Sequence, residues 1–338
     1  MQFITATFTL ALLVSGCGQD AVRLPEHVLA GETMGTTFSV KIVQDGELAD
    51  KAIIGQRITD TLAALDQALS TYKPDSELSR FNRSTSTDWV RVDREVCDIV
   101  SAALEISKLT DGAFDITVGP LVNLWGFGPE TYRTEPPAGE KIRGAMQAVG
   151  YQKLEVDCDQ AALRKSTPGV YVDLSGFAKG YAVDRLAEIL DERTIENYLV
   201  EIGGEVRMKG FNAAGNPWAI AIEKPLDDAR SVQTIVHLTD AAMATSGDYR
   251  NFFEWNGKRY SHTIDPATGF PVTHDGAAVT VVADAAARAD GLATGLLVLG
   301  PDKGMALADS HGIAAYFLVR SNGSFAERSS DAFRNMTP

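Results

Sequence analysis

The chain has 338 residues and a formal net charge of −14, with 45% hydrophobic and 22% charged residues. This length suffices for one large or two moderate domains with a sizeable core, and the composition is that of a globular protein. The acidic balance, without a long run of Lys or Arg, argues against binding to the phosphate backbone of nucleic acid. It leaves room for a local basic pocket that binds a small phosphate ligand.

The N-terminus is interpreted as a targeting segment rather than as part of the folded protein. Phe3 to Val14 is a short apolar run, too short to span a bilayer as a helix. It leads into Val14-Ser15-Gly16-Cys17, which resembles the bacterial lipobox although no Lys or Arg follows Met1. We therefore expect a lipoprotein signal peptide over residues 1–16 and a tether over 17–27 that begins at a lipidated Cys17. A plain secretory signal is the alternative.

Beyond this segment, no stretch reaches the roughly 20 apolar residues of a membrane-spanning helix. The mature chain is thus expected to be exported to the bacterial cell envelope and anchored to a membrane by its lipid, facing the periplasm. Cys97 and Cys158 then remain. They either form one disulfide or stay as two buried thiols, and neither has the spacing of a zinc site.

Hydrophobic periodicity predicts the helices in the first half of the chain. Apolar residues recur at helical spacing over residues 47–70 and 93–109, and a shorter helix is predicted over 141–149. Before the first helix, residues 28–43 end in an alternating strand, and the glycines that flank Met34 suggest a bulge or a close backbone approach. The Pro-rich stretch from Arg133 to Gly139 is the expected boundary between two lobes.

The segment from Val170 to Leu190 is predicted to be a strand, a glycine turn and a helix. That arrangement offers backbone N–H groups and a positive helix end to a phosphate. Lys179 falls in the first helical turn, where its charge opposes the helix dipole, so an anion bound between them would explain it. An ordinary helix start with a solvated Lys is the alternative.

Further strands are predicted over 218–223, 231–238 and 313–319, with a glycine-interrupted strand over 198–210 and a small-residue segment over 241–248. Asp265 to Gly269 is a predicted turn. His262 lies close to it, and its pKa near neutrality suits a general base, although an isolated His is more often bonded to its own loop.

A buried strand over 279–282 precedes a predicted helix over 287–299, which Gly300-Pro301 ends, and a second helix over 302–309. Asp290 and Thr294 are four residues apart, so their side chains share one helix face. A carboxylate and a hydroxyl are hard oxygen donors that suit Mg²⁺ or Ca²⁺. The alternative is an ordinary capped helix packed on a sheet.

Six segments in one order together resemble the ApbE family, the FAD:protein FMN transferases once named thiamine biosynthesis lipoproteins. They are residues 31–36, 70–78, 112–115, 172–181, 261–266 and 289–295. The resemblance extends from about Gly31 to Val319. It implies an α+β fold of mixed sheets with flanking helices and two lobes around a FAD cleft, in one catalytic domain over residues 28–338.

The resemblance also implies a reaction. Family members split FAD at its pyrophosphate, join the FMN half to a Ser or Thr hydroxyl of another protein and release AMP, with Mg²⁺ required. The usual acceptors are exported flavoprotein subunits of respiratory redox complexes and reductases. A FAD pyrophosphatase that gives FMN and AMP, and a non-catalytic FAD-binding lipoprotein, are the alternatives; the retained Asp290, Thr294 and His262 argue against the second.

By resemblance, Asp290 and Thr294 bind Mg²⁺ through their side chains and Gly176 through its carbonyl. His262 or Asp265 takes the proton from the acceptor hydroxyl, and His262 is preferred. The residues that match the lining of the FAD site are Met34, Tyr72, Ala113, Phe114, Asp115, Asp173, Lys179 and Ile264. Ala293 stands where some members carry a further carboxylate, and some relatives have an acidic residue in place of Lys179.

Overall fold

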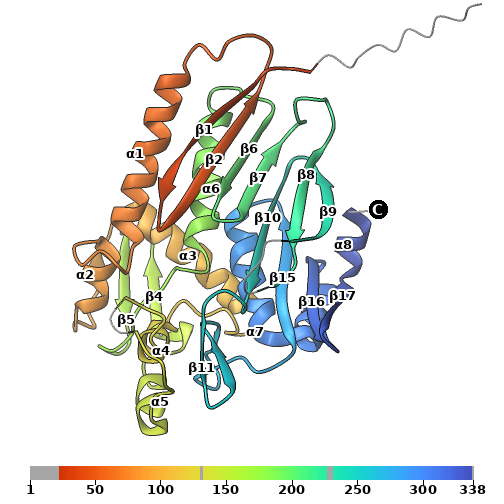
Figure 1. The fold of residues 1–338 in the computed structure, drawn as a ribbon. Coiled ribbons are helices and arrows are strands. Elements are labelled where there is room, and N and C mark those ends of the chain that lie inside the picture. The colour runs from red at the N-terminus through yellow and green to blue at the C-terminus, as the bar shows by residue number, and fades with distance from the viewer. Residues whose placement is uncertain (1–22, 130–131, 227–230, 337–338) are drawn as a thin grey trace, which may run out of the picture.

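An antiparallel sheet of eight strands is the framework of the protein (Figure 1). The structure, a computed structural model, describes residues 23–129, 132–226 and 231–336. The predicted signal peptide and Cys17 therefore lie outside the described residues. In spatial order the strands are β1 (Glu26–Thr33), β2 (Thr36–Val43), β6 (Tyr198–Ile202), β7 (Glu205–Lys209), β10 (Ala241–Gly247), β15 (Gly276–Ala283), β16 (Ala314–Ser321) and β17 (Ser324–Ser329).

Long helices cover one face of this sheet (Figure 1). They are α1 (Lys51–Leu69), α3 (Arg94–Leu109), α6 (Ala178–Asp191) and α7 (Ala286–His311). The opposite face is covered by the hairpin β8 (Trp218–Glu223) and β9 (Val232–Leu238) and by α8 (Asp331–Met336). In β15, Val279 and Val281 pack into the helical core, whereas Ala278 and Val282 pack into the other. Burial on both faces explains why this strand is a continuous apolar run.

Smaller elements form the lower part of the molecule in Figure 1. A three-stranded sheet contains β3 (Val90–Arg91), β5 (Ala162–Lys165) and β4 (Leu154–Asp157). A separate apolar cluster around the buried Trp125 joins two short helices to residues of two small hairpins. The remaining elements are α2 (Glu77–Arg83), α4 (Gly119–Trp125), α5 (Gly139–Met146), the 3₁₀ helix η1 (Tyr151–Lys153), β11 (Phe252–Trp255), β12 (Lys258–Ser261), β13 (Ile264–Asp265) and β14 (Phe270–Pro271).

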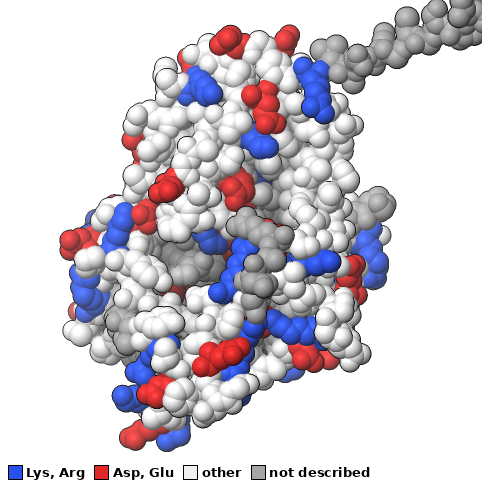
Figure 2. All heavy atoms as spheres, viewed as in Figure 1, with Lys and Arg blue, Asp and Glu red and all other residues white. Residues whose placement is uncertain are grey.

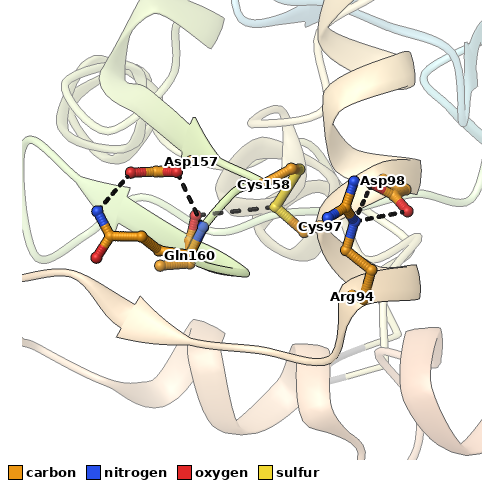
Figure 3. The surroundings of a disulfide bond; sticks show 7 residues. Arg94, Cys97, Asp98, Asp157, Cys158 and Gln160 are labelled. Carbon is orange, nitrogen blue, oxygen red and sulfur yellow. Dashed lines mark hydrogen bonds and ion pairs between the residues drawn. A yellow bond between two sulfur atoms is a disulfide. The ribbon is translucent and has the colours of Figure 1, made fainter.

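A disulfide joins Cys97 of α3 to Cys158, which lies in the turn between β4 and β5 (Figure 3). The two Cα atoms are 5.6 Å apart, within the usual range for a disulfide. The bond resolves the alternative that the sequence left open, and it fastens the three-stranded sheet to a helix of the main core.

The predicted helices are confirmed with small changes at their ends. The helix predicted over 47–70 is α1, and the one over 93–109 is α3. Gly300 interrupts α7 with a φ of 78°, so the predicted break between the helices over 287–299 and 302–309 is present. The strands over 218–223, 231–238, 279–282 and 313–319 are β8, β9 and parts of β15 and β16.

Three local predictions are corrected by tertiary pairing. Residues 170–174 do not form a strand: the side chain of Asn82 bonds both the N–H and the carbonyl of Val172, at 2.8 Å each, in place of a neighbouring strand. The glycine break at Gly203-Gly204 is the turn of the β6–β7 hairpin. Met34 sits in the turn between β1 and β2 rather than in a bulge.

Residues 132–138, near the predicted lobe boundary, are a loop before α5; the boundary itself stays a prediction. None of the helices in the three described ranges is both long and apolar enough to cross a bilayer.

Candidate active site

A cavity of about 410 Å³ lies where the N-terminal part of α6 and the middle of α7 meet the ends of β7 and β10. Loops from distant parts of the chain complete it with residues from 71–72, 113–118, 127–129, 173–176 and 249–251 and with His262, Thr263, Ile264 and Pro266. Three helix or strand ends and several loops therefore supply one concave surface, which is typical of a small-molecule site.

Most of the residues singled out from the sequence line this cavity. They are Tyr72, Ala113, Phe114, Asp115, Asp173, Gly176, Lys179, His262, Ile264, Asp290 and Thr294. Met34 and Asp265 are not among the lining residues. Met34 has a φ of 47° in the β1–β2 turn and packs partly buried against the main core, so the structure does not bring it together with the others.

The three predicted metal ligands lie together. Asp290 is 3% exposed, and one of its carboxylate oxygens accepts a hydrogen bond from the N–H of Gly180 at 3.1 Å. A methyl group placed on Gly176 would lie 3.0 Å from Thr294 Oγ1, so glycine permits the backbone to approach that hydroxyl. Ser246 Oγ is 2.9 Å from the same Thr294 oxygen.

Among the described residues, no cluster of three His, Cys, Asp or Glu side chains could hold a metal ion. The set formed by Asp290, Thr294 and the Gly176 carbonyl contains only one such side chain. It fits a hard cation that keeps several water ligands, as Mg²⁺ does, and it does not fit zinc.

Lys179 is paired with a carboxylate that the sequence reasoning missed. Its Nζ lies 2.6 Å from Glu205 Oε1, and Glu205 is 4% exposed. Burial raises the pKa of Glu205 to about 7, and Asp290 adds to that rise while Lys179 opposes it. Burial lowers the pKa of Lys179, but the combined charges of Asp290, Glu205 and Glu201 outweigh it, so the net shift is upward. Lys179 is therefore a cation at neutral pH.

His262 follows β12 and is held by the backbone. Its Nδ1 is 3.1 Å from the carbonyl oxygen of Asn251. Because a carbonyl oxygen only accepts, Nδ1 carries the hydrogen and Nε2 is left with a lone pair. Burial lowers the pKa of His262, partly offset by Asn251 and Asp248. The ring is thus neutral at pH 7 and able to accept a proton.

Asp265 has a different environment. One carboxylate oxygen accepts from the N–H of Ala267 at 2.9 Å, and the other accepts from the hydroxyl of Thr268 at 3.0 Å. Both oxygens are occupied in holding the predicted turn, and the residue does not line the cavity. Of the two candidate bases, the geometry favours His262.

Asp115 and Tyr72 line the cavity in different ways. Asp115 accepts hydrogen bonds from the N–H of Thr117 at 2.7 Å and from the N–H of Tyr151 at 2.8 Å, so it organises the loop that carries Ala113 and Phe114. Tyr72 is 66% exposed, which leaves its ring free for a planar ligand.

Glu205 and the segment Thr245-Ser246-Gly247 are among the lining residues that sequence reasoning did not select. The signals were present but weak: Glu205 follows a double glycine, and Ser246 precedes a turn. A wider hollow of about 750 Å³, lined by Asp248, Ser261 and Arg320 among others, contains none of the predicted site residues.

Comparison with known proteins agrees with the geometry. The model of the ApbE family matches residues 34–317. A FAD:protein FMN transferase of Vibrio cholerae is 46% identical over 323 residues, which cover 96% of this chain and 95% of that protein. A FAD:protein FMN transferase of Escherichia coli K12 is 42% identical and covers 98% of this chain and 96% of its own length.

Solved structures give the same result. The flavin transferase ApbE of Vibrio cholerae superposes with a TM-score of 0.85 at 44% identity, covering 93% of this chain and 99% of that chain. The apo form of the flavinyl transferase ApbE of Pseudomonas stutzeri also has a TM-score of 0.85, at 41% identity, covering 94% and 98%. The fold and these relatives define an α+β enzyme of the transferase class. The chain belongs to the ApbE family.

Proposed function

We propose that this chain transfers the FMN half of FAD to a Ser or Thr hydroxyl of an exported flavoprotein and releases AMP, with Mg²⁺ as cofactor. The observation that carries the proposal is the cavity itself. Lys179, His262, Asp290 and Thr294 line it together, which supports a site that combines a cation, a base and two oxygen donors for a metal ion. Relatives that share more than two-fifths of their sequence with this chain are named FAD:protein FMN transferases.

The proposed reaction is a displacement at phosphorus. The acceptor hydroxyl oxygen forms a new bond to the FMN phosphorus, the bond from that phosphorus to the bridging oxygen breaks, and AMP leaves with that oxygen. His262 Nε2 takes the hydroxyl proton as the bond forms. Lys179 sits in the first turn of α6, where its ammonium and the helix N-terminus both favour phosphate oxygens.

Asp290, Thr294 and the Gly176 carbonyl would hold the Mg²⁺. When bound, the ion would neutralise charge on the pyrophosphate and on the departing AMP. The protein's own contribution is positioning: α7 presents two of these ligands from one face, and the turn before α6 presents the third.

The partners follow from the same proposal. Acceptors would be exported flavoprotein subunits of respiratory redox complexes or reductases. The lipidated Cys17 would hold the enzyme at a membrane of the cell envelope, facing the periplasm. The disulfide between Cys97 and Cys158 supports export, since such bonds persist in oxidising compartments. On the face in Figure 2 cationic and anionic side chains are interspersed, which supports the absence of nucleic acid among the partners.

The test uses the form of the chain that begins after Cys17. It is mixed with FAD, Mg²⁺ and an exported flavoprotein domain from the same cell, and the products are separated on a denaturing gel under ultraviolet light. We expect a fluorescent acceptor band that requires Mg²⁺, with AMP released in equal amount. Asp290→Ala is expected to abolish the Mg²⁺-dependent band, and unchanged turnover by that variant would refute the metal assignment.

Other outcomes are equally informative. AMP and free FMN without a labelled band would favour a FAD pyrophosphatase. FAD that stays bound and intact would favour a flavin-binding lipoprotein. Incorporation of a palmitate analogue that Cys17→Ala abolishes would test the anchor.

A further inference from the structure

The strand β7 and the helix α6 face each other through three ion pairs. Arg207 Nη1 lies 2.7 Å from Asp184 Oδ1, and Lys209 Nζ lies 3.1 Å from Asp191 Oδ1. The third pair is Glu205 with Lys179, at 2.6 Å. We call these three pairs the β7–α6 ladder; α6 lies behind β6 and β7 in Figure 1.

The ladder occupies a face of the sheet that is otherwise apolar. In the β6–β7 hairpin, Glu205 stands directly opposite Ile202, which is fully buried. Neighbours across an antiparallel pair share a face, so the Glu205 carboxylate points into the helical core rather than toward solvent. A charge at such a position is costly unless it is paired.

One pair in the ladder is reversed. In the other two pairs the strand supplies the cation and the helix supplies the carboxylate. At the end of the ladder that lines the cavity, the strand supplies the carboxylate, Glu205, and the helix supplies the cation, Lys179. The reversal places an ammonium in the first turn of α6, where the helix dipole disfavours it.

The second oxygen of this carboxylate is not satisfied. Within the described part of the chain, Glu205 Oε2 is buried and has no hydrogen-bond partner. Buried polar atoms are usually paired, and an exception in a functional cavity calls for an explanation. Asp290 also acts electrostatically on both Lys179 and Glu205. It accepts a hydrogen bond from the N–H of Gly180, the residue after Lys179, so both carboxylates belong to the surroundings of one ammonium.

From this arrangement we infer that Glu205 is a positioning residue that keeps Lys179 away from Asp290. Glu205 holds the ammonium at 2.6 Å, so the Asp290 carboxylate stays available to a divalent cation and Lys179 stays available to the pyrophosphate. Without this contact, the carboxylates that still act on Lys179 are Asp290 and Glu201. Of these two, Asp290 lines the cavity with Lys179 and bonds the N–H of the next residue, Gly180. The ammonium then competes with the divalent cation for Asp290. The inference rests on the proposed function for the identity of the two ligands.

Two variants distinguish the effect of the position of the Glu205 carboxylate from the effect of its charge. Glu205→Gln keeps the shape and loses the charge. Glu205→Asp keeps the charge but is one methylene shorter, so its carboxylate no longer reaches Lys179 at contact distance. Lys209→Gln is the control: it removes a charge, of the opposite sign, from the same strand and the same ladder at a partly exposed position away from the cavity.

The measurement is Mn²⁺ binding, followed by the electron paramagnetic resonance of the free ion, without nucleotide and with ADP as a pyrophosphate probe. We expect both Glu205 variants to bind Mn²⁺ about tenfold more weakly than the wild type, since a unit charge moved by a few ångströms has an effect of that order. Lys209→Gln should bind as the wild type does. A thermal melt of each variant confirms that it is folded.

Wild-type affinity in Glu205→Asp would overturn the inference, because charge alone would then suffice. Wild-type affinity in both variants, or equal weakening in Lys209→Gln, would also overturn it. If the wild type binds no Mn²⁺ under either condition, the metal assignment of the proposed function fails and the inference fails with it. Transfer activity is not part of the readout, so a failure of Glu205 alone is distinguishable from a failure of the proposed reaction.

Discussion

Asn82 offers the sharpest test of how the cavity is assembled. Its side-chain amide takes the place of a strand partner for Val172, donating to the carbonyl and accepting from the N–H at 2.8 Å each. Asn82 is 8% exposed and Val172 is fully buried, so water cannot replace these bonds. The change to make is Asn82→Leu, which keeps the branching of the side chain at Cγ, is somewhat larger and removes both hydrogen bonds.

The magnitude follows from the two groups left unpaired. A buried donor or acceptor without a partner costs about 1–3 kcal/mol. The N–H and the carbonyl of Val172 together should therefore lower the free energy of unfolding by about 2–6 kcal/mol. That is a large part of the stability of a typical domain, about 5–15 kcal/mol.

Urea unfolding measures the loss, and quenching of flavin fluorescence measures FAD binding. The segment after Val172 carries Asp173 and Gly176 into the cavity, so FAD affinity should fall as well. Asn212→Leu is the control: this amide also bonds backbone groups, at 2.9 Å to Ala214 N and 3.0 Å to Pro217 O, but in a surface turn where water can replace it. An Asn82→Leu protein within about 1 kcal/mol of the wild type, with unchanged FAD affinity, would refute the reasoning.

Three further predictions concern His262, the start of helix α7 and the disulfide. Because burial lowers the pKa of His262, the rate of AMP release should show an acid limb below pH 6.5 as the ring gains a proton, separate from any limb near pH 7 that comes from Glu205; a limb below pH 6.5 that is retained in His262→Gln would contradict the assignment. Asp184→Ala should lower the free energy of unfolding in urea by about 3 kcal/mol. This buried carboxylate pairs with Arg207 and accepts hydrogen bonds from the first two N–H groups of α7. An unchanged free energy of unfolding would show that α7 needs no cap. Replacing both Cys97 and Cys158 by Ala should lower the free energy of unfolding by about 4 kcal/mol, given their sequence separation of 61, and reductant should lower the wild type to the same level but leave the variant unchanged.

The elements that depend on nearby residues, above all the helices, were predicted well from the sequence. Helical spacing of apolar residues located α1 and α3, and Gly300-Pro301 located the break in α7. These signals are local, because a helix satisfies its own backbone within a few residues. Most of the residues that the six ordered segments selected are brought together by the fold in one cavity.

Features that depend on contacts between distant segments of the chain were not predictable from local sequence signals. The stretch around Val172 has strand-like residues, but the amide of Asn82, 90 residues away, supplies both hydrogen bonds of Val172, and Ile116 accepts from the N–H of Asp173. Asp265 has the carboxylate of a candidate base, but both of its oxygens accept hydrogen bonds from residues of its own turn.

Glu205 shows the same limit most clearly. The sequence alone determined that a carboxylate follows a glycine pair. Only the tertiary structure decided that this carboxylate faces the core opposite Ile202 and meets Lys179 of α6. The physical reason is that a strand has no internal partners, so the neighbours that fold beside it determine which face, and which charge, each of its side chains meets.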